Sequence, residues 1–233
     1  MEVIEVNILV CNHKGGVGKT FVASHLAFLL SERYNVLGID GDSQRNLSLW
    51  LLGSRDKEGF REIEDRYFKR EGKLACYHLT SANLNFIEQE VRKYDYCIFD
   101  SSPKDTEMTS LLEFVDVVIM PDEYNSKFSF IGISDVLSIM KQQNIDIPTY
   151  ILFNKVPPMR YGIYKLMSEI RQAKLGLDVI PFYITLTVRV PEAEFNFSPV
   201  WSGYYGYRSP IRKTFIGILN FLKIEGDFYE NRR

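Results

Sequence analysis

A glycine-rich segment near the N-terminus has the residue types and the spacing of a phosphate-binding loop. It reads Lys14-Gly15-Gly16-Val17-Gly18-Lys19-Thr20. Glycines let backbone N–H groups turn inward around phosphate oxygens, and the N-terminus of a following helix adds partial positive charge. Lys19 would reach the β- and γ-phosphates, and the Thr20 hydroxyl would ligate Mg²⁺. The strict pattern Gly-x-x-x-x-Gly-Lys-[Ser/Thr] places a glycine at position 13, where this chain has His13.

Acidic residues end two further apolar runs. Residues 35–40 end on Asp40, with Asp42 two positions on, and residues 94–100 end on Asp100. Acids at the carboxyl ends of strands lie beside the phosphate site in an open α/β sheet. The alternative for Asp40 and Asp42 is that they only cap the helix that follows.

The elements that must position these residues follow from the hydrophobic pattern. Short, fully apolar strands that alternate with helices predict a mostly parallel central sheet with helices on both faces. No segment rich in Pro, Gly or Ser divides the chain, so residues 1–233 are expected to form a single domain. Residues 53–73 favour an exposed helix or loop, and residues 182–210 an irregular segment. Strands are predicted at 3–11, 35–40, 94–100, 115–121, 149–154 and 177–181, and helices at 21–33, 133–143, 164–174 and 211–223.

Composition limits the class of protein. The chain has 233 residues, of which 45% are hydrophobic and 25% charged, the balance of a globular protein with a core. No window reaches the ~18 uncharged apolar residues of a membrane span, and acids stand where a secretory signal carries bases. Three cysteines without CxxC spacing argue against a disulfide scaffold or a zinc site. These features predict a cytoplasmic protein.

The glycine-rich loop resembles the deviant Walker A box of the ParA/MinD family of ATPases. That family has a second lysine early in the loop, which Lys14 matches. The resemblance implies a P-loop NTPase fold, ATP and Mg²⁺ as ligands, and nucleotide contacts from Lys14 through Phe21. It also implies that Lys14 reaches the nucleotide of a partner copy in an ATP-sandwich homodimer, where a cation neutralises charge on the transferred phosphoryl group. Lys14, Lys19 and Asp42 are then the catalytic residues.

The acidic segments resemble other motifs of the family. By resemblance, Asp42 orients the attacking water, Asp40 supports the metal shell, and Asp100 is the Walker B acid that holds Mg²⁺ together with Thr20. Ser43 stands where proline is usual, and Arg45 where glycine is common.

Two later strands resemble those that border the adenine base. Asn154 is expected to contact the base edge, and the backbone of Pro181 and Phe182 to flank the ring. The alternative is that these residues are ordinary strand ends. The acids at 122–123 depart from the uncharged residues that the family has there.

Charge is distributed unevenly along the chain. Residues 1–154 carry a net charge of −7, and residues 155–223 carry +6. A basic region of this kind is typical either of a solvated surface or of a polyanion-binding face. By resemblance, an ATP-bound dimer would bind DNA without sequence preference and associate with the nucleoid. The candidate DNA contacts are Lys165, Arg171, Lys174, Arg189, Arg208, Arg212 and Lys213.

These features favour a DNA partition ATPase whose hydrolysis is triggered by a centromere-bound, ParB-like adaptor. The chain starts at its first strand, so we expect no helix-turn-helix before it. The alternatives are a MinD-like positioning ATPase on a membrane or protein cargo, and a weakly hydrolysing scaffold. An iron-protein-like redox enzyme is a further alternative. It would need cysteines exposed at a dimer axis to hold a cluster, and Cys76 is the one candidate among the three. The helix at 211–223 is expected to pack in the core rather than bind lipid, because an acidic tail at 225–230 follows it.

Overall fold

The fold is built on one twisted sheet in which the strand order departs from the chain order. The computed structural model describes residues 6–42, 44–52, 61–64, 67–69, 73–78, 84–102, 111–124, 126–158, 162–172, 177–187, 189–202 and 206–224. In this part of the chain the sheet has nine strands in the order β3-β4-β5-β2-β6-β1-β7-β8-β9. The seven strands from β5 to β9 are parallel, and β4 and β3 extend the β5 edge antiparallel. The strands are β1 (Val6–Val10), β2 (Val36–Asp40), β3 (Arg61–Glu64), β4 (Tyr67–Lys69), β5 (Leu74–His78), β6 (Tyr96–Asp100), β7 (Val117–Glu123), β8 (Thr149–Val156) and β9 (Asp178–Thr185).

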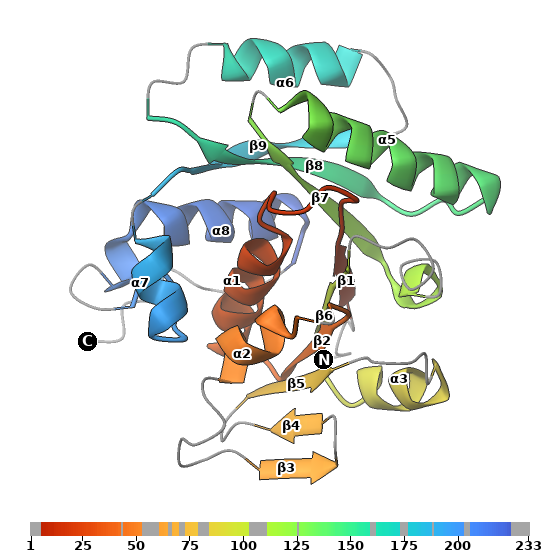
Figure 1. Cartoon of the computed structure of the whole chain (residues 1–233), viewed down its shortest axis with the longest axis vertical. Coiled ribbons are helices and arrows are strands. Elements are labelled where there is room, and N and C mark those ends of the chain that lie inside the picture. The colour runs from red at the N-terminus through yellow and green to blue at the C-terminus, as the bar shows by residue number, and fades with distance from the viewer. Residues whose placement is uncertain are drawn as a thin grey trace.

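Helices cover both faces of the sheet, as Figure 1 shows. One face carries α1 (Lys19–Ser31), α2 (Asn46–Leu52), α7 (Val190–Phe195) and α8 (Pro210–Phe221). The other carries α3 (Leu84–Val91), α5 (Lys127–Gln142) and α6 (Ile163–Gln172). Short 3₁₀ turns lie at Leu112–Phe114 and Gly206–Arg208.

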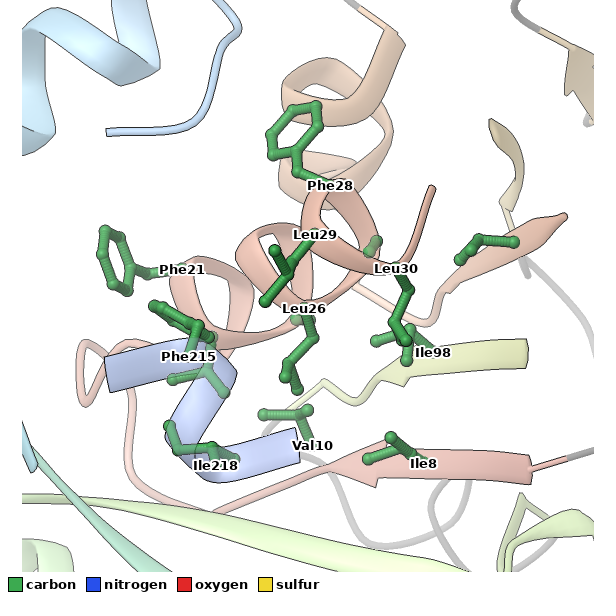
Figure 2. Packing of buried hydrophobic residues seen from close by; sticks show 14 of the residues in the cluster. Ile8, Val10, Phe21, Leu26, Phe28, Leu29, Leu30, Ile98, Phe215 and Ile218 are labelled. Atoms are coloured by element: carbon green, nitrogen blue, oxygen red, sulfur yellow. The ribbon is translucent and has the colours of Figure 1, made fainter. Parts of the chain in front are cut away.

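The core is divided by the sheet into two layers. Side chains alternate along each strand, so β1 sends Ile8 and Val10 toward α1 and sends Leu9 toward α5. Both faces are buried, which is why the strands are continuously apolar rather than alternating. Figure 2 shows the α1 layer, in which Leu26, Leu29 and Leu30 of α1 and Phe215 and Ile218 of α8 lie close to Ile8, Val10 and Ile98 of the sheet.

The predicted fold class is confirmed, and each of the six predicted strands is present. The prediction for residues 53–73 was wrong where the structure describes them, because β3 and β4 pair there as an antiparallel hairpin. Strand β5 was also missed, because its order comes from pairing with β2, a partner far away in the sequence. Helix α5 begins at Lys127, six residues before the predicted start at 133. Exposed apolar side chains in its first turns obscure the helical pattern, as with Phe128 and Ile131.

Strand β9 continues past the proline that was predicted to end it. Its pairing with β8 shifts between Ile151↔Val179 and Phe153↔Tyr183, so one residue of β8 lies opposite three of β9. Pro181 lies within this irregularity, at the edge of the sheet, where its missing N–H costs no ladder bond. The prediction that the strand ends at Pro181 was therefore wrong, since it ends at Thr185.

The C-terminal helix packs in the core, as predicted. Ile211, Phe215, Ile216 and Leu219 of α8 are buried. A β-carbon at Gly217 would lie 2.7 Å from the Phe182 ring, so the absence of a side chain there lets α8 approach β9. The acidic tail at 225–230 lies outside the described residues. None of the helices described is long and apolar enough to cross a membrane.

A buried histidine joins α1 to the segment before α8. His25 Nε2 accepts a hydrogen bond of 3.0 Å from the Val200 backbone N–H, so Nδ1 carries the proton and donates to Phe21 O at 2.8 Å. Its ring stacks on Phe21 and Phe215, with centroids 4.1 and 5.5 Å away. Burial lowers the pKa of His25 to about 3.

We expect this histidine to make stability fall as pH falls. In the unfolded chain this histidine is protonated below its ordinary pKa of about 6.5. In the folded chain it stays neutral until the pH falls to about 3. The free energy of unfolding should therefore lose about 2 kcal/mol between pH 7.5 and 5 through His25. Urea titrations of the wild type and of His25→Phe at both pH values measure this. An equal pH dependence in the two proteins would contradict it.

Candidate phosphate and nucleotide site

The glycine-rich loop connects β1 to α1 at the carboxyl edge of the sheet. Gly16 and Gly18 have φ angles of +77° and +96°, a conformation that favours glycine. Gly18 is the N-cap residue of α1, and its carbonyl accepts from Val22 N at 3.0 Å. The helix N-terminus therefore points its free N–H groups into the loop, an arrangement suited to an anion.

Lys19 and Thr20, the first residues of α1, face Asp100 at the end of β6. The Thr20 hydroxyl donates to Asp100 Oδ2 at 2.6 Å. The Lys19 ammonium is buried and donates to the Lys14 carbonyl at 3.2 Å. The structure thus brings together three residues that the sequence placed in this site.

Burial controls the ionisation of the two charged groups. It raises the pKa of Asp100 to about 8, an effect that the Thr20 hydrogen bond opposes and that nearby Asp40 adds to. Burial also lowers the pKa of Lys19, although the Asp100 charge acts in the opposite direction. Each group is thus shifted toward its neutral form, and such shifts are typical of functional sites.

The residues around Asp100 fit a magnesium ion. Asp100 Oδ1 is buried and accepts no hydrogen bond from the described residues. Carboxylate and hydroxyl oxygens are the ligands that Mg²⁺ prefers, with water and phosphate oxygens completing the shell. Asp100 and Thr20 would hold the ion, whose chemistry is to neutralise phosphate charge.

Asp40 and Asp42 have different environments although they are two residues apart. Asp40 is fully buried: Oδ2 accepts from Ser48 N at 2.7 Å and Ser48 Oγ at 2.8 Å, and Oδ1 accepts from Asp42 N at 3.1 Å. These hydrogen bonds connect α2 to the carboxyl end of β2. Both oxygens of Asp40 are used, so Asp40 would support the metal shell only indirectly. Asp42 is partly exposed, and its Oδ1 accepts from Gln44 N at 3.0 Å. Ser43 lies outside the described residues.

Asn154, predicted to contact a base, braces the loop in this structure. Its Nδ2 donates to Val17 O at 2.8 Å, and its Oδ1 accepts from Lys155 N at 2.8 Å. A β-carbon on Gly18 would lie 2.1 Å from Asn154 Nδ2, which is a second reason for glycine there. Sequence reasoning found the residue but not this role, because no local pattern records a contact 137 positions away.

A cavity of about 390 Å³ opens beyond the end of β9. The predicted base-flanking pair lies elsewhere, since Pro181 is inside β9 and Phe182 packs against α8. The start of α1 is nearby, because the Phe21 and Phe215 rings are 6.2 Å apart and Thr214 lines the cavity. The lining residues are Thr185, Leu186, Thr187, Arg189, Val200, Ser209, Pro210, Ile211 and Thr214.

The predicted DNA contacts do not form one face. Arg212 is only 2% exposed, and its Nη2 lies 2.6 Å from Glu32 Oε2 at the end of α1, so its prediction as a surface DNA contact was wrong. Arg171 binds Asp178 at 3.2 Å and the Val179 carbonyl at 2.6 Å.

The remaining candidates divide between the two faces. Lys165 is exposed on α6 and lies 3.7 Å from Glu169. Arg189, Arg208 and Lys213 are exposed near α7 and α8, on the opposite side of the sheet, and Lys174 lies outside the described residues.

The burial of the cysteines argues against the alternative of an iron-protein-like redox enzyme, which would need exposed cysteines. Cys11, Cys76 and Cys97 are all buried and free of disulfides. Cys76, which the sequence suggested could be exposed, lies inside β5 with its sulfur 3.6 Å from Ser48 Oγ. A cluster shared between two copies would require exposed thiolates, which these cysteines do not offer.

The loop, the acids and the sheet define a nucleotide-binding P-loop domain, and comparison with known proteins places it in a family. Residues 8–200 match the family described as the CobQ/CobB/MinD/ParA nucleotide binding domain. The chain belongs to this family. An uncharacterised protein of Methanocaldococcus jannaschii is 30% identical over an alignment of 236 positions. The alignment covers 84% of this chain and 90% of that protein.

Solved structures show the same fold. A candidate plasmid partition protein of Borrelia burgdorferi B31 bound to AMPPNP is similar with a TM-score of 0.70 at 21% identity, covering 94% of this chain and 98% of that one. A chain of the MinC:MinD cell division protein complex of Aquifex aeolicus gives a TM-score of 0.75 at 17% identity, with 98% of each chain covered. At these identities the likeness establishes the fold alone.

We expect Asp100→Asn to separate stability from metal binding. Because the folded pKa is raised, the wild type loses stability as pH rises from about 4 to 8, whereas asparagine does not titrate. Without nucleotide the variant should melt a few degrees higher, about 4 °C, at pH 8. It should lose the extra thermal shift that Mg²⁺ gives with ATP. Asp146→Asn, exposed before β8, is the matched control. The same magnesium-dependent shift in Asp100→Asn and wild type would contradict the assignment.

Proposed function

We propose that this chain is a Mg²⁺-dependent ATPase that pairs with a second copy when ATP is bound. One observation carries the proposal: the loop presents an exposed lysine, Lys14, five residues before a buried one, Lys19. Lys19 serves the phosphates bound in its own loop. Lys14 faces solvent, so its ammonium is available to phosphates held by another copy, as the family resemblance implies.

The other residues have separate roles in this proposal. Thr20 and Asp100 would hold the metal, and the carboxylate of partly exposed Asp42 would accept a hydrogen bond from the attacking water and orient it toward the γ-phosphate. The base occupies the cavity beyond β9, where hydroxyl groups and backbone of Thr185–Thr187 replace the predicted Pro181 and Phe182. One amide hydrogen of Asn154 is used by Val17 O, so we assign Asn154 chiefly to the loop and leave the base edge to its second amide hydrogen.

We propose further that the ATP-bound pair segregates DNA. Support comes from the likeness to a candidate plasmid partition protein and from the exposed bases Arg208, Lys213 and Arg189. Contacts of this kind bind phosphates without reading sequence. A ParB-like adaptor bound at a centromere would stimulate hydrolysis and release the DNA, and association with the nucleoid would depend on ATP.

A second candidate is a positioning ATPase for a protein cargo. The first turns of α5 carry Phe128 and Ile131, whose exposed fractions are 71% and 55%. Large exposed apolar side chains side by side are typical of protein-binding surfaces. The likeness to MinD in complex with MinC is compatible with this reading. Duplex DNA binding that does not respond to nucleotide, or that is absent at low salt, would favour the cargo reading over DNA segregation.

We expect Lys14→Ala to uncouple ATP binding from pairing. Size-exclusion chromatography with light scattering should show an Mg·ATP-dependent dimer for the wild type and a monomer for the variant. Turnover should fall about 100-fold or more, the order expected when a cation is removed from the transferred phosphoryl group. Lys141→Ala is the control, because Lys141 is an exposed lysine in the last turn of α5. A variant that still pairs and turns over normally would exclude the role of Lys14 across an interface.

We expect the exposed bases of the α8 region to carry DNA binding. Arg208→Ala combined with Lys213→Ala should weaken ATP-dependent duplex binding, and the slope of log affinity against log salt should decrease by about 2. Lys165→Ala on the opposite face should have a smaller effect. Fluorescence anisotropy across a salt series measures both. An unchanged slope in the double variant would remove these residues from the proposed DNA surface.

A further inference from the structure

The side chain of Asn12 joins three segments of chain where the loop begins. It is fully buried, two residues after β1 ends. Its Nδ2 donates to Pro121 O in β7 at 2.9 Å and to Ser129 O in α5 at 3.3 Å. Its Oδ1 accepts from Lys14 N at 2.8 Å. Both amide hydrogens and the carbonyl oxygen are thus used, so the carboxamide has a single satisfactory orientation.

Helix α5 packs directly on this set of hydrogen bonds. A β-carbon at Gly132 would lie 2.2 Å from Asn12 Oδ1 and 2.8 Å from Lys14 N. Real β-carbons do not approach that closely, so only glycine allows the helix backbone to sit against the bond between Asn12 and Lys14. The position of α5 and the geometry of this bond are therefore coupled.

The residue held in this way is the lysine on which the proposed function depends. Lys14 is fixed through its N–H to Asn12, and its carbonyl accepts from the buried Lys19 ammonium at 3.2 Å. Its side chain leaves the loop into solvent. Fixing the backbone on both sides sets the direction in which the side chain departs, and so where its ammonium can reach.

We propose that Asn12 is a positioning residue for the ATPase reaction: it holds the backbone of Lys14 in register with α5, and acts on the reaction only through that lysine. The inference rests on the proposed function, in which Lys14 serves a nucleotide across the interface. An aspartate has no donors for the two carbonyls, and serine or alanine would not span the three segments. A misplacement of about 1 Å is enough to cost much of the rate.

The test compares two variants that disturb the hydrogen bonds of Asn12. Each is made in the wild type and in a Lys14→Ala background. Asn12→Asp removes the donors to Pro121 O and Ser129 O, and Gly132→Ala presses on the acceptor from the α5 side. Each should lower ATP turnover about tenfold or more while the Kd of Mg·ADP stays within about threefold, because the loop still holds a nucleotide. In a Lys14→Ala background neither should lower turnover further, since residues that act as a unit are not additive.

A buried hydrogen bond far from the loop supplies the control. Thr149 is buried at the start of β8, on the opposite edge of the sheet, and its hydroxyl donates to Ile147 O at 2.7 Å. Thr149→Val should leave turnover within about twofold of the wild type. Losses from Asn12→Asp that multiply with those of Lys14→Ala, or a loss of Mg·ADP affinity equal to the loss of turnover, would overturn the proposal.

Hydrogen exchange separates this inference from the proposed function. The exchange rate of the Lys14 amide, measured without nucleotide, should rise about tenfold in Gly132→Ala, because the bond to Asn12 is displaced. Exchange in that variant equal to the wild type would overturn the inference even if turnover falls. A wild type that neither pairs nor turns over ATP, with an exchange rate that still rises in the variant, would refute the proposed function and leave the bond from Asn12 to Lys14 established.

Discussion

The parallel register of three central strands is the constraint on which the site depends. Val10 of β1 and Asp40 of β2 both align with Asp100 of β6, so the loop and the two acids emerge at one level. After the strands end, Gly41 N still donates to Asp100 O at 2.9 Å. A slip of one residue would turn the Asp100 side chain to the α5 face and remove its hydrogen bond with Thr20.

The parts of the site predictable from sequence were those that local chemistry determines. The loop at 14–20 needs its glycines and cations in sequence, and strands buried on both faces are apolar throughout. The failures depend on distant partners. Arg212 carries a surface-type charge, yet it is buried because Glu32 stands 180 positions away. Strand β5 is ordered by β2, and Pro181 fits a strand only because β9 is an edge.

The electrostatics of the pocket suit a ligand that brings negative charge and a cation together. Burial moves Lys19 and Asp100 in opposite directions on the pKa scale, and both shifts favour the neutral form. Phosphate beside Lys19 favours its charged form, and a divalent ion beside Asp100 favours the carboxylate. Binding of a magnesium nucleotide therefore acts against the burial shift at both groups and favours the charged form of each.

The loop is held by side-chain amides on one side and faces the acidic residues on the other. The acids come from β2 and β6, whereas the braces, Asn12 to Pro121 O and Asn154 to Val17 O, come from the side of β7 and β8. Gly16 and Gly18 adopt their positive φ angles without a steric cost, and these two amides hold the backbone near them, at Lys14 and Val17. In the role proposed for Asn12, a change at α5 would reach Lys14 through that residue, whose hydrogen bonds share no atom with the bond from Thr20 to Asp100. In the proposed function, the residues that position Lys14 and those that would hold the metal thus lie beside different strands of one sheet.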